Sequence, residues 1–284
     1  MIILISLVMA IAPAIFLLVY YYKQDSAKPE PKGLIFKIFM LGFASIIPAI
    51  IIELIVDSFV NVYAFLPIFY YLLKSFFVAA LVEESLKLFI VKKFAYNDVH
   101  FDEVMDGIVY TVVASLGFAC FENVLYVMGS DWEVAILRAF TAVPLHAISA
   151  GIMGFYIGKA KFANSYIEER SLIMKGFWFA IIFHGVYDFL IFSMPVFGML
   201  SGLLVIPQLI FGFIFLRKKI KLAIAEDIQE GRTLEVDYDN IELNENNYAS
   251  MSRAELRRRV QHELLLNKEK PNDISSSMNE NIEL

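Results

Sequence analysis

Residues 106–128 read DGIVYTVVASLGFACFENVLYVM, an apolar run with few polar side chains. About 20 such residues form a helix long enough to cross a hydrocarbon core roughly 30 Å thick. In lipid, only a structure that satisfies its own backbone hydrogen bonds can span, and a helix does so within one segment. The stretch therefore predicts a transmembrane helix. It decides the fold class because similar runs recur along the chain.

The whole chain has the composition of a membrane protein. Of its 284 residues, 58% are hydrophobic and 19% are charged, and the mean hydropathy is +0.63. Soluble domains contain about 45–50% apolar and about 25% charged residues. A soluble enzyme, a secreted disulfide scaffold and a disordered chain are excluded, and the single cysteine, Cys120, has no intrachain partner for a disulfide. The net charge of −6 also lacks the basic excess of a nucleic-acid-binding protein.

The apolar runs predict an all-α, polytopic bundle of about seven transmembrane helices. Their expected bounds are 2–22, 34–56, 66–91, 106–128, 134–158, 172–193 and 196–216. We expect residues 1–216 to form the transmembrane domain and 217–284 to form a short cytoplasmic tail. In this tail we expect an acidic linker at 226–248, a short helix at 252–268 and a disordered end.

Basic residues alternate between the connections of these runs. Lys or Arg residues follow the first, third, fifth and seventh runs, and the connections 57–65, 129–133 and 194–195 contain none. Short loops rich in Lys and Arg remain in the cytoplasm. The alternation therefore predicts a multi-pass protein of the cell membrane with its N-terminus outside and its C-terminus in the cytoplasm. The first run lacks a basic leader and a clear cleavage site, so we expect a retained span.

Ionisable side chains occur in four consecutive runs, where each costs about 2.5–3.5 kcal/mol at mid-bilayer. They are Glu83, Glu84 and Lys87 in the third run, Glu122 in the fourth, His146 in the fifth, and His184 and Asp188 in the sixth. Glu83 and Lys87 share a helix face, whereas Glu84 lies about 100° round the helix. The two carboxylates are therefore expected to point to different places, with one of them performing the chemistry. Asp188, one turn after His184, is expected to orient that imidazole.

Each feature alone also fits a structural role, such as an ion pair, an interhelical contact or a buried hydrogen-bond cluster. Taken together, however, the ionisable residues in these four runs are more numerous than the stability of a helical bundle requires. Small residues follow His146 at four-residue steps, at Ala150, Gly154 and Gly158, and this stripe would let another helix approach closely. Other charged residues lie toward the outer ends of their runs, where long side chains reach the interface. These residues are Glu53, Lys74 and Arg138.

Four motifs in order on consecutive runs resemble the PrsW family of intramembrane proteases, which is related to the CAAX-type prenyl endopeptidases. They are Glu-Glu-x-x-Lys at Glu83, Glu84 and Lys87, Phe-x-x-x-Glu-Asn at Phe118, Glu122 and Asn123, the histidine His146, and His-Gly-x-x-Asp at His184 and Asp188. The second motif ends in Glu where the wider group has His. The resemblance covers roughly residues 30–216. It implies a peptidase that cleaves single-span membrane proteins such as anti-sigma factors, as the first step of a proteolytic cascade.

With this resemblance, the first hypothesis is that Glu83 acts as general base on a water molecule, assisted by His146. His184 would stabilise the oxyanion or protonate the leaving amine. The expected catalytic set is Glu83, Glu84, His146 and His184, supported by Lys87, Phe118, Glu122, Asn123 and Asp188. The cofactor is either absent or a single divalent metal such as zinc. Its candidate ligands are Glu83, Glu122, His146 and His184.

Two other classes remain open from the sequence. An ion-coupled transporter also buries charged residues within its spans, although the runs show no obvious inverted halves. A non-catalytic scaffold subunit would keep its function when Glu83 is changed to Gln. For the peptidase, the expected partners are a single-span membrane protein substrate and membrane lipid, and no nucleic acid.

Overall fold

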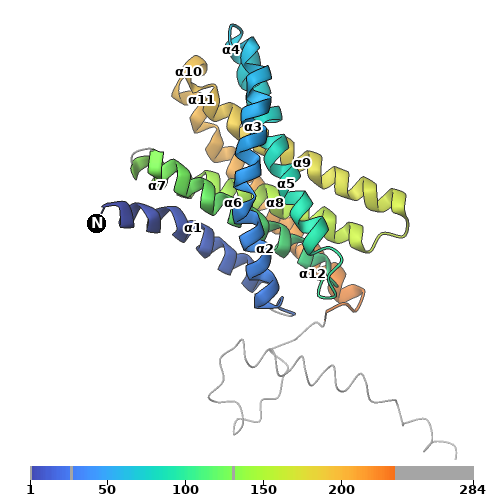
Figure 1. The fold of residues 1–284 in the computed structure, drawn as a ribbon. Helices are drawn as coiled ribbons and strands as arrows, with labels where there is room; N and C mark the ends of the chain where they lie inside the picture. The colour runs from blue at the N-terminus through green and yellow to red at the C-terminus, as the bar shows by residue number, and fades with distance from the viewer. Residues whose placement is uncertain (1, 26–27, 130–131, 234–284) are drawn as a thin grey trace, which may run out of the picture. The chain divides into compact units, whose positions relative to one another are not determined.

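The computed structural model describes residues 2–25, 28–129 and 132–233, and in these ranges the chain forms helices and no strand (Figure 1). The helices belong to one compact unit that extends to Arg232. The all-α expectation is therefore confirmed. The expected tail helix at 252–268, and all of the expected linker beyond residue 233, lie outside the described residues.

The helices have the following bounds in chain order. They are α1 (Ile2–Gln24), α2 (Lys32–Ala44), α3 (Ile46–Val60), η1 (Asn61–Tyr63), α4 (Pro67–Leu73), η2 (Lys74–Ala80), α5 (Leu81–Phe94), α6 (Val104–Gly129), α7 (Trp132–Phe140), α8 (Ala142–Lys161), α9 (Tyr166–Phe192), α10 (Met194–Phe197), α11 (Met199–Leu203) and α12 (Val205–Gln229). Here η1 is a short 3₁₀ helix and η2 is a π-helix.

Five helical segments of the described chain are long and apolar enough to cross a membrane. They are Lys32–Tyr63, Val104–Gly129, Ile136–Lys161, Tyr166–Phe192 and Met199–Gln229. Helix α1 and the charged helix α4–η2–α5 occupy the other two expected positions but are not among the five. The chain is thus a multi-pass membrane protein, and the expected count of seven spans is not confirmed.

Helix α6 is the centre of the packing. All of its residues from Val104 to Cys120 are buried, and it packs against α1, α2 and, most extensively, α8. Glycines permit this closeness, because a Cβ on Gly107 would overlap the backbone of Gly154 and Gly158. Helix α6 therefore packs closely against Gly154 and Gly158 of the small-residue stripe on α8. The spacing of this stripe predicted that another helix would approach here.

Two expected spans are interrupted near the polar residues. The fifth run breaks at Thr141 into α7 and α8, three residues before Pro144, which has no backbone N–H to continue the helical ladder. In the third run, Lys74–Ala80 winds as a π-helix that ends three residues before Glu83. Such turns are common at functional sites, since they shift the register of the residues that follow.

The last helix continues far beyond the expected end at residue 216. Helix α12 reaches Gln229, so the expected domain boundary falls inside a helix. The reason is a contact at its end: the Asp227 carboxylate accepts hydrogen bonds from the backbone N–H groups of Val104 and Met105, at 2.8 and 3.0 Å. Asp227 thereby caps the N-terminus of α6, whose first N–H groups have no partner within the helix.

Candidate active site

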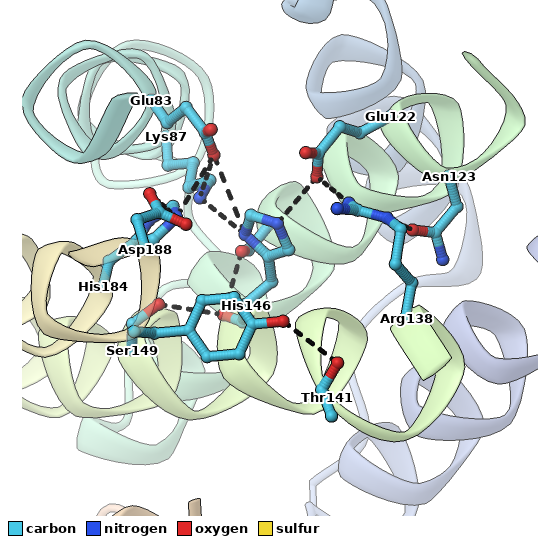
Figure 2. Close-up of polar contacts among 12 residues, drawn as sticks. Glu83, Lys87, Glu122, Asn123, Arg138, Thr141, His146, Ser149, His184 and Asp188 are labelled. Carbon is cyan, nitrogen blue, oxygen red and sulfur yellow. Dashed lines mark hydrogen bonds and ion pairs between the residues drawn. The ribbon is translucent and has the colours of Figure 1, made fainter. Parts of the chain in front are cut away.

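Four helices bring the ionisable residues together in one buried cluster (Figure 2). Helix α5 supplies Glu83, Glu84 and Lys87, α6 supplies Glu122, α8 supplies His146, and α9 supplies His184 and Asp188. Except for Glu122, whose side chain is 16% exposed, each of these residues is buried. All the sequence-predicted polar residues therefore lie in or next to a single site.

Lys87 is the cation within this cluster. Its Nζ lies 2.7 Å from Glu84 Oε1, 3.3 Å from Glu83 Oε2 and 3.0 Å from His146 Nδ1, and the side chain is fully buried. The ring of Phe118 covers it, with the ammonium 5.0 Å from the ring centroid. The two adjacent carboxylates thus reach one ammonium, although we expected them to point to different places. Lys87 lies three and four residues after them and fits between both.

The imidazole of His146 is held by a carboxylate on one side. Its Nε2 lies 2.9 Å from Glu122 Oε2, and its Nδ1 lies 3.9 Å from Glu83 Oε2. An ionised carboxylate only accepts, so we assign the ring proton to Nε2. The lone pair on Nδ1 then accepts from Lys87 and faces Glu83.

The imidazole of His184 has the same arrangement with different partners. Its Nδ1 lies 2.8 Å from Glu84 Oε1, so Nδ1–H donates to that carboxylate. Its Nε2 lies 4.0 Å from Glu83 Oε2 and 3.4 Å from Asp188 Oδ2. We expected Asp188 to orient this ring, but Glu84 makes the closer contact. Asp188 Oδ2 is buried and has no hydrogen-bond partner among the described residues.

Arg138 belongs to this site, which the sequence did not indicate. We expected its side chain to reach the outer interface, yet only 14% of it is exposed. Its Nη2 lies 2.8 Å from Glu122 Oε2, and its Nε donates to Asn123 Oδ1 at 2.8 Å. Glu122 and Asn123 therefore meet at one guanidinium (Figure 2). The signal that could have found Arg138 is the need of a carboxylate in an apolar run, Glu122, for a nearby cation.

A cavity of about 610 Å³ opens beside the cluster. Glu83, Glu122, His146, His184 and Asp188 line its polar side, and residues of α9, α11 and α12 supply much of its apolar wall. Glu53 and Lys74, which we expected near the outer interface, also line it. The cavity thus combines ionisable side chains on one side with a largely apolar wall on the other.

One set of donors in this cavity has the geometry of a metal site. Glu83, His146 and His184 each offer a ligand atom, and these atoms all lie within 4.8 Å of one another. Glu122, an expected candidate ligand, instead binds the remaining nitrogen of His146. A second such group combines Asp25, which directly follows α1, with Glu103 and Asp106 at the start of α6.

Comparisons with known proteins assign the chain to a family. The model of the "PrsW family intramembrane metalloprotease" family matches residues 30–216, so the chain belongs to this family and is a protease, a hydrolase. The Protease PrsW of Geobacillus kaustophilus is 37% identical over 195 residues, 68% of this chain and 82% of that protein. The Protease PrsW of Bacillus subtilis is 39% identical over 185 residues, 64% of this chain and 80% of that protein. No solved structure shows a significant match.

Proposed function

We propose that this protease hydrolyses a peptide bond of single-span membrane proteins in the cavity beside Glu83. The observation that carries the proposal is the position of Glu83 Oε2, which lies 3.9 Å from His146 Nδ1 and 4.0 Å from His184 Nε2. Both imidazoles come from other helices, and all three groups line the cavity. A carboxylate and two imidazoles facing one space are the groups needed to activate water and to protonate a leaving amine.

The donor set fits a divalent metal such as zinc. Catalytic zinc sites use three protein ligands of the His and Glu type, and Glu83, His146 and His184 would supply them. Each histidine has a carboxylate on its other ring nitrogen, Glu122 for His146 and Glu84 for His184. Such partners orient the ring and increase its basicity toward a metal. When bound, the metal would lower the pKa of a coordinated water and polarise the scissile carbonyl.

The formal charges of the site also favour a dication. Four carboxylates, of Glu83, Glu84, Glu122 and Asp188, face two cations, Lys87 and Arg138. With neutral imidazoles, two negative charges are left without a partner in a buried site, where an uncompensated charge is costly. Asp188 Oδ2, which is buried, makes no hydrogen bond among the described residues and has only the His184 imidazole close by, with Nε2 at 3.4 Å.

The residues divide the work as follows. Without a bound metal, Glu83 takes the proton of the attacking water, and His146 holds that water beside it. Where Glu83, His146 and His184 hold a metal, Asp188 would take that proton instead. Without a metal, His184 in its doubly protonated form donates from Nε2 to the oxyanion or to the leaving amine, and an oxyanion donor contributes about 2.7–4 kcal/mol. Lys87 and Glu84 fix the charge and the orientation of Glu83 and His184. The apolar wall holds the segment that surrounds the scissile bond.

For the substrate we propose a single-span membrane protein, such as an anti-sigma factor, which is cut in the first step of a regulated cascade. The N-terminus lies outside and the C-terminus in the cytoplasm, as the basic connections indicate. A lipid environment surrounds the bundle, because many large apolar side chains of the five long segments are exposed.

The test compares the new N-termini of membrane proteins in cells that contain the intact chain or the Glu83→Gln variant at equal abundance. We expect a small set of single-span proteins to lose its cleavage products in the variant. The control is Glu230→Gln, an exposed glutamate after the end of α12, which should leave the products unchanged. Coinciding profiles of the intact chain and Glu83→Gln would reject the proposal and favour a scaffold.

A further inference from the structure

We propose that Arg138 is a positioning residue for the reaction, which acts by holding the Glu122 carboxylate against Nε2 of His146. This inference rests on the proposed function. It gives a role to helix α7, from which no catalytic residue was expected. It also explains why a glutamate in the second motif requires a cation from outside all four motifs.

Three residues of α6 contact the guanidinium, and Figure 2 shows two of them, Glu122 and Asn123. Nη2 lies 2.8 Å from Glu122 Oε2, Nε donates to Asn123 Oδ1 at 2.8 Å, and the group lies 3.8 Å from the ring centroid of Tyr126. These partners are at positions i, i+1 and i+4 of one helix. The planar fork of arginine and its stacking on an aromatic ring suit this geometry, whereas the single ammonium of lysine cannot reproduce it.

The same carboxylate oxygen connects Arg138 to the catalytic imidazole. Glu122 Oε2 forms an ion pair with Arg138 Nη2 at 2.8 Å and also lies 2.9 Å from His146 Nε2. Its position therefore determines how the ring turns and which nitrogen faces Glu83. Without the guanidinium, the carboxylate would lose its charge partner and one of the two contacts that fix it. His146 Nδ1 would then lose its alignment with Glu83, which lies 3.9 Å away.

Arg138 also connects α7 to the site. Helix α7 ends at Phe140, and the break at Thr141 precedes His146 by five residues. The other fixed point at this break is Tyr187 on α9, whose hydroxyl donates to Thr141 Oγ1 at 3.0 Å. The guanidinium thus holds α7 to the outer end of α6, on the wall of the cavity that contains Glu122 and His146.

The experiment is a double-mutant cycle on the Glu83-dependent cleavage products defined above, followed as rates of product formation in cells. The variants are Arg138→Gln, Arg138→Lys, Glu122→Gln, and the double variant of Arg138→Gln with Glu122→Gln. Removing a partner that orients a metal-binding or catalytic histidine typically costs about 10–100-fold in activity. We expect a loss of this order for Arg138→Gln, a partial recovery for Arg138→Lys, and a double variant no slower than Glu122→Gln alone.

The control is Lys159→Gln, which breaks a 2.7 Å ion pair with Glu226 outside the cavity and should leave the rate unchanged. Thermal unfolding of each purified variant separates positioning from folding, because the recovery with lysine and the lack of additivity must appear at equal folded fraction. A full rate for Arg138→Gln, or a double variant whose loss is the product of the two single losses, would overturn the inference. If Glu83→Gln itself changes no product, the proposed function fails, and the inference fails with it.

Discussion

Glu84 Oε1 lies 2.8 Å from His184 Nδ1, and the two residues are 100 positions apart in the chain. The same oxygen accepts from Lys87 Nζ at 2.7 Å, and Glu84 is completely buried. One carboxylate oxygen therefore holds the imidazole of α9 and the ammonium of α5. Glu83, its neighbour, instead faces both imidazoles and the cavity. The adjacent glutamates thus have different surroundings, and we propose different tasks for them: Glu84 orients, and Glu83 reacts or binds a metal.

The first prediction follows from this division. Removing one partner of a buried, hydrogen-bonded charge pair costs about 3–5 kcal/mol. Glu84→Gln should therefore lower the unfolding midpoint of the protein in detergent markedly, as well as abolish cleavage. Glu83→Gln should abolish cleavage with a much smaller change in the midpoint, because its Oε2 is farther from Lys87, at 3.3 Å. Equal losses of stability in the two variants would contradict the assignment.

The second prediction concerns metal removal. A strong chelator should stop cleavage by the purified protease, and Zn²⁺ should restore it, because Glu83, His146 and His184 present a donor set for one ion. The number of zinc ions bound per chain, measured by elemental analysis, should fall from one toward zero in His146→Ala and His184→Ala. Cleavage that continues at full rate without bound metal would favour Glu83 as a metal-free general base.

Much of the site could be predicted because inserting its ionisable side chains into a membrane costs free energy. Glu83, His146 and His184 can be recognised in the sequence because they are ionisable residues inside apolar runs, where such residues are rare and costly. The structure brings the three together. A close helix contact at the glycines one turn apart on α8 was also predicted, although not that α6 would make it. In both cases the signal is local: a polar residue within an apolar run, or small residues at a helical spacing.

What could not be predicted depends on how helices rotate against one another. Asp188 is one turn from His184 and was the natural partner by spacing, yet Glu84 on another helix lies closer to the ring. Arg138 appears peripheral along its own run and becomes central only because α7 packs on α6. The π-helix before Glu83 was not predicted either, and the break at Thr141 was missed although Pro144 lies three residues after it.

The third prediction tests the close approach of α6 and α8. Gly154→Ala places a methyl group against the backbone of Gly107 and Ile108, which cannot move as a flexible side chain would. Overpacking of this kind costs about 1–3 kcal/mol or more, so the unfolding midpoint should fall. Gly33→Ala is the matched control on α2, where a Cβ meets no atom within 4 Å. A helical Gly→Ala change gains about 0.5–1 kcal/mol, so the control should be neutral or slightly more stable.

The fourth prediction concerns pH and Glu30, which lies before α2 and is only 4% exposed. Burial raises the pKa of this carboxyl from 4.5 to about 7, against the smaller opposing effects of hydrogen bonds with Asp106 and with the Tyr110 hydroxyl, which donates to it. Between these two values the folded state binds more protons than the unfolded state, so stability falls as the pH rises through this window. The unfolding midpoint should therefore decrease between pH 5 and about pH 7, in accordance with this linkage. In Glu30→Gln, which cannot ionise, the decrease should be smaller; parallel pH profiles for the two proteins would show that Glu30 is not the group responsible.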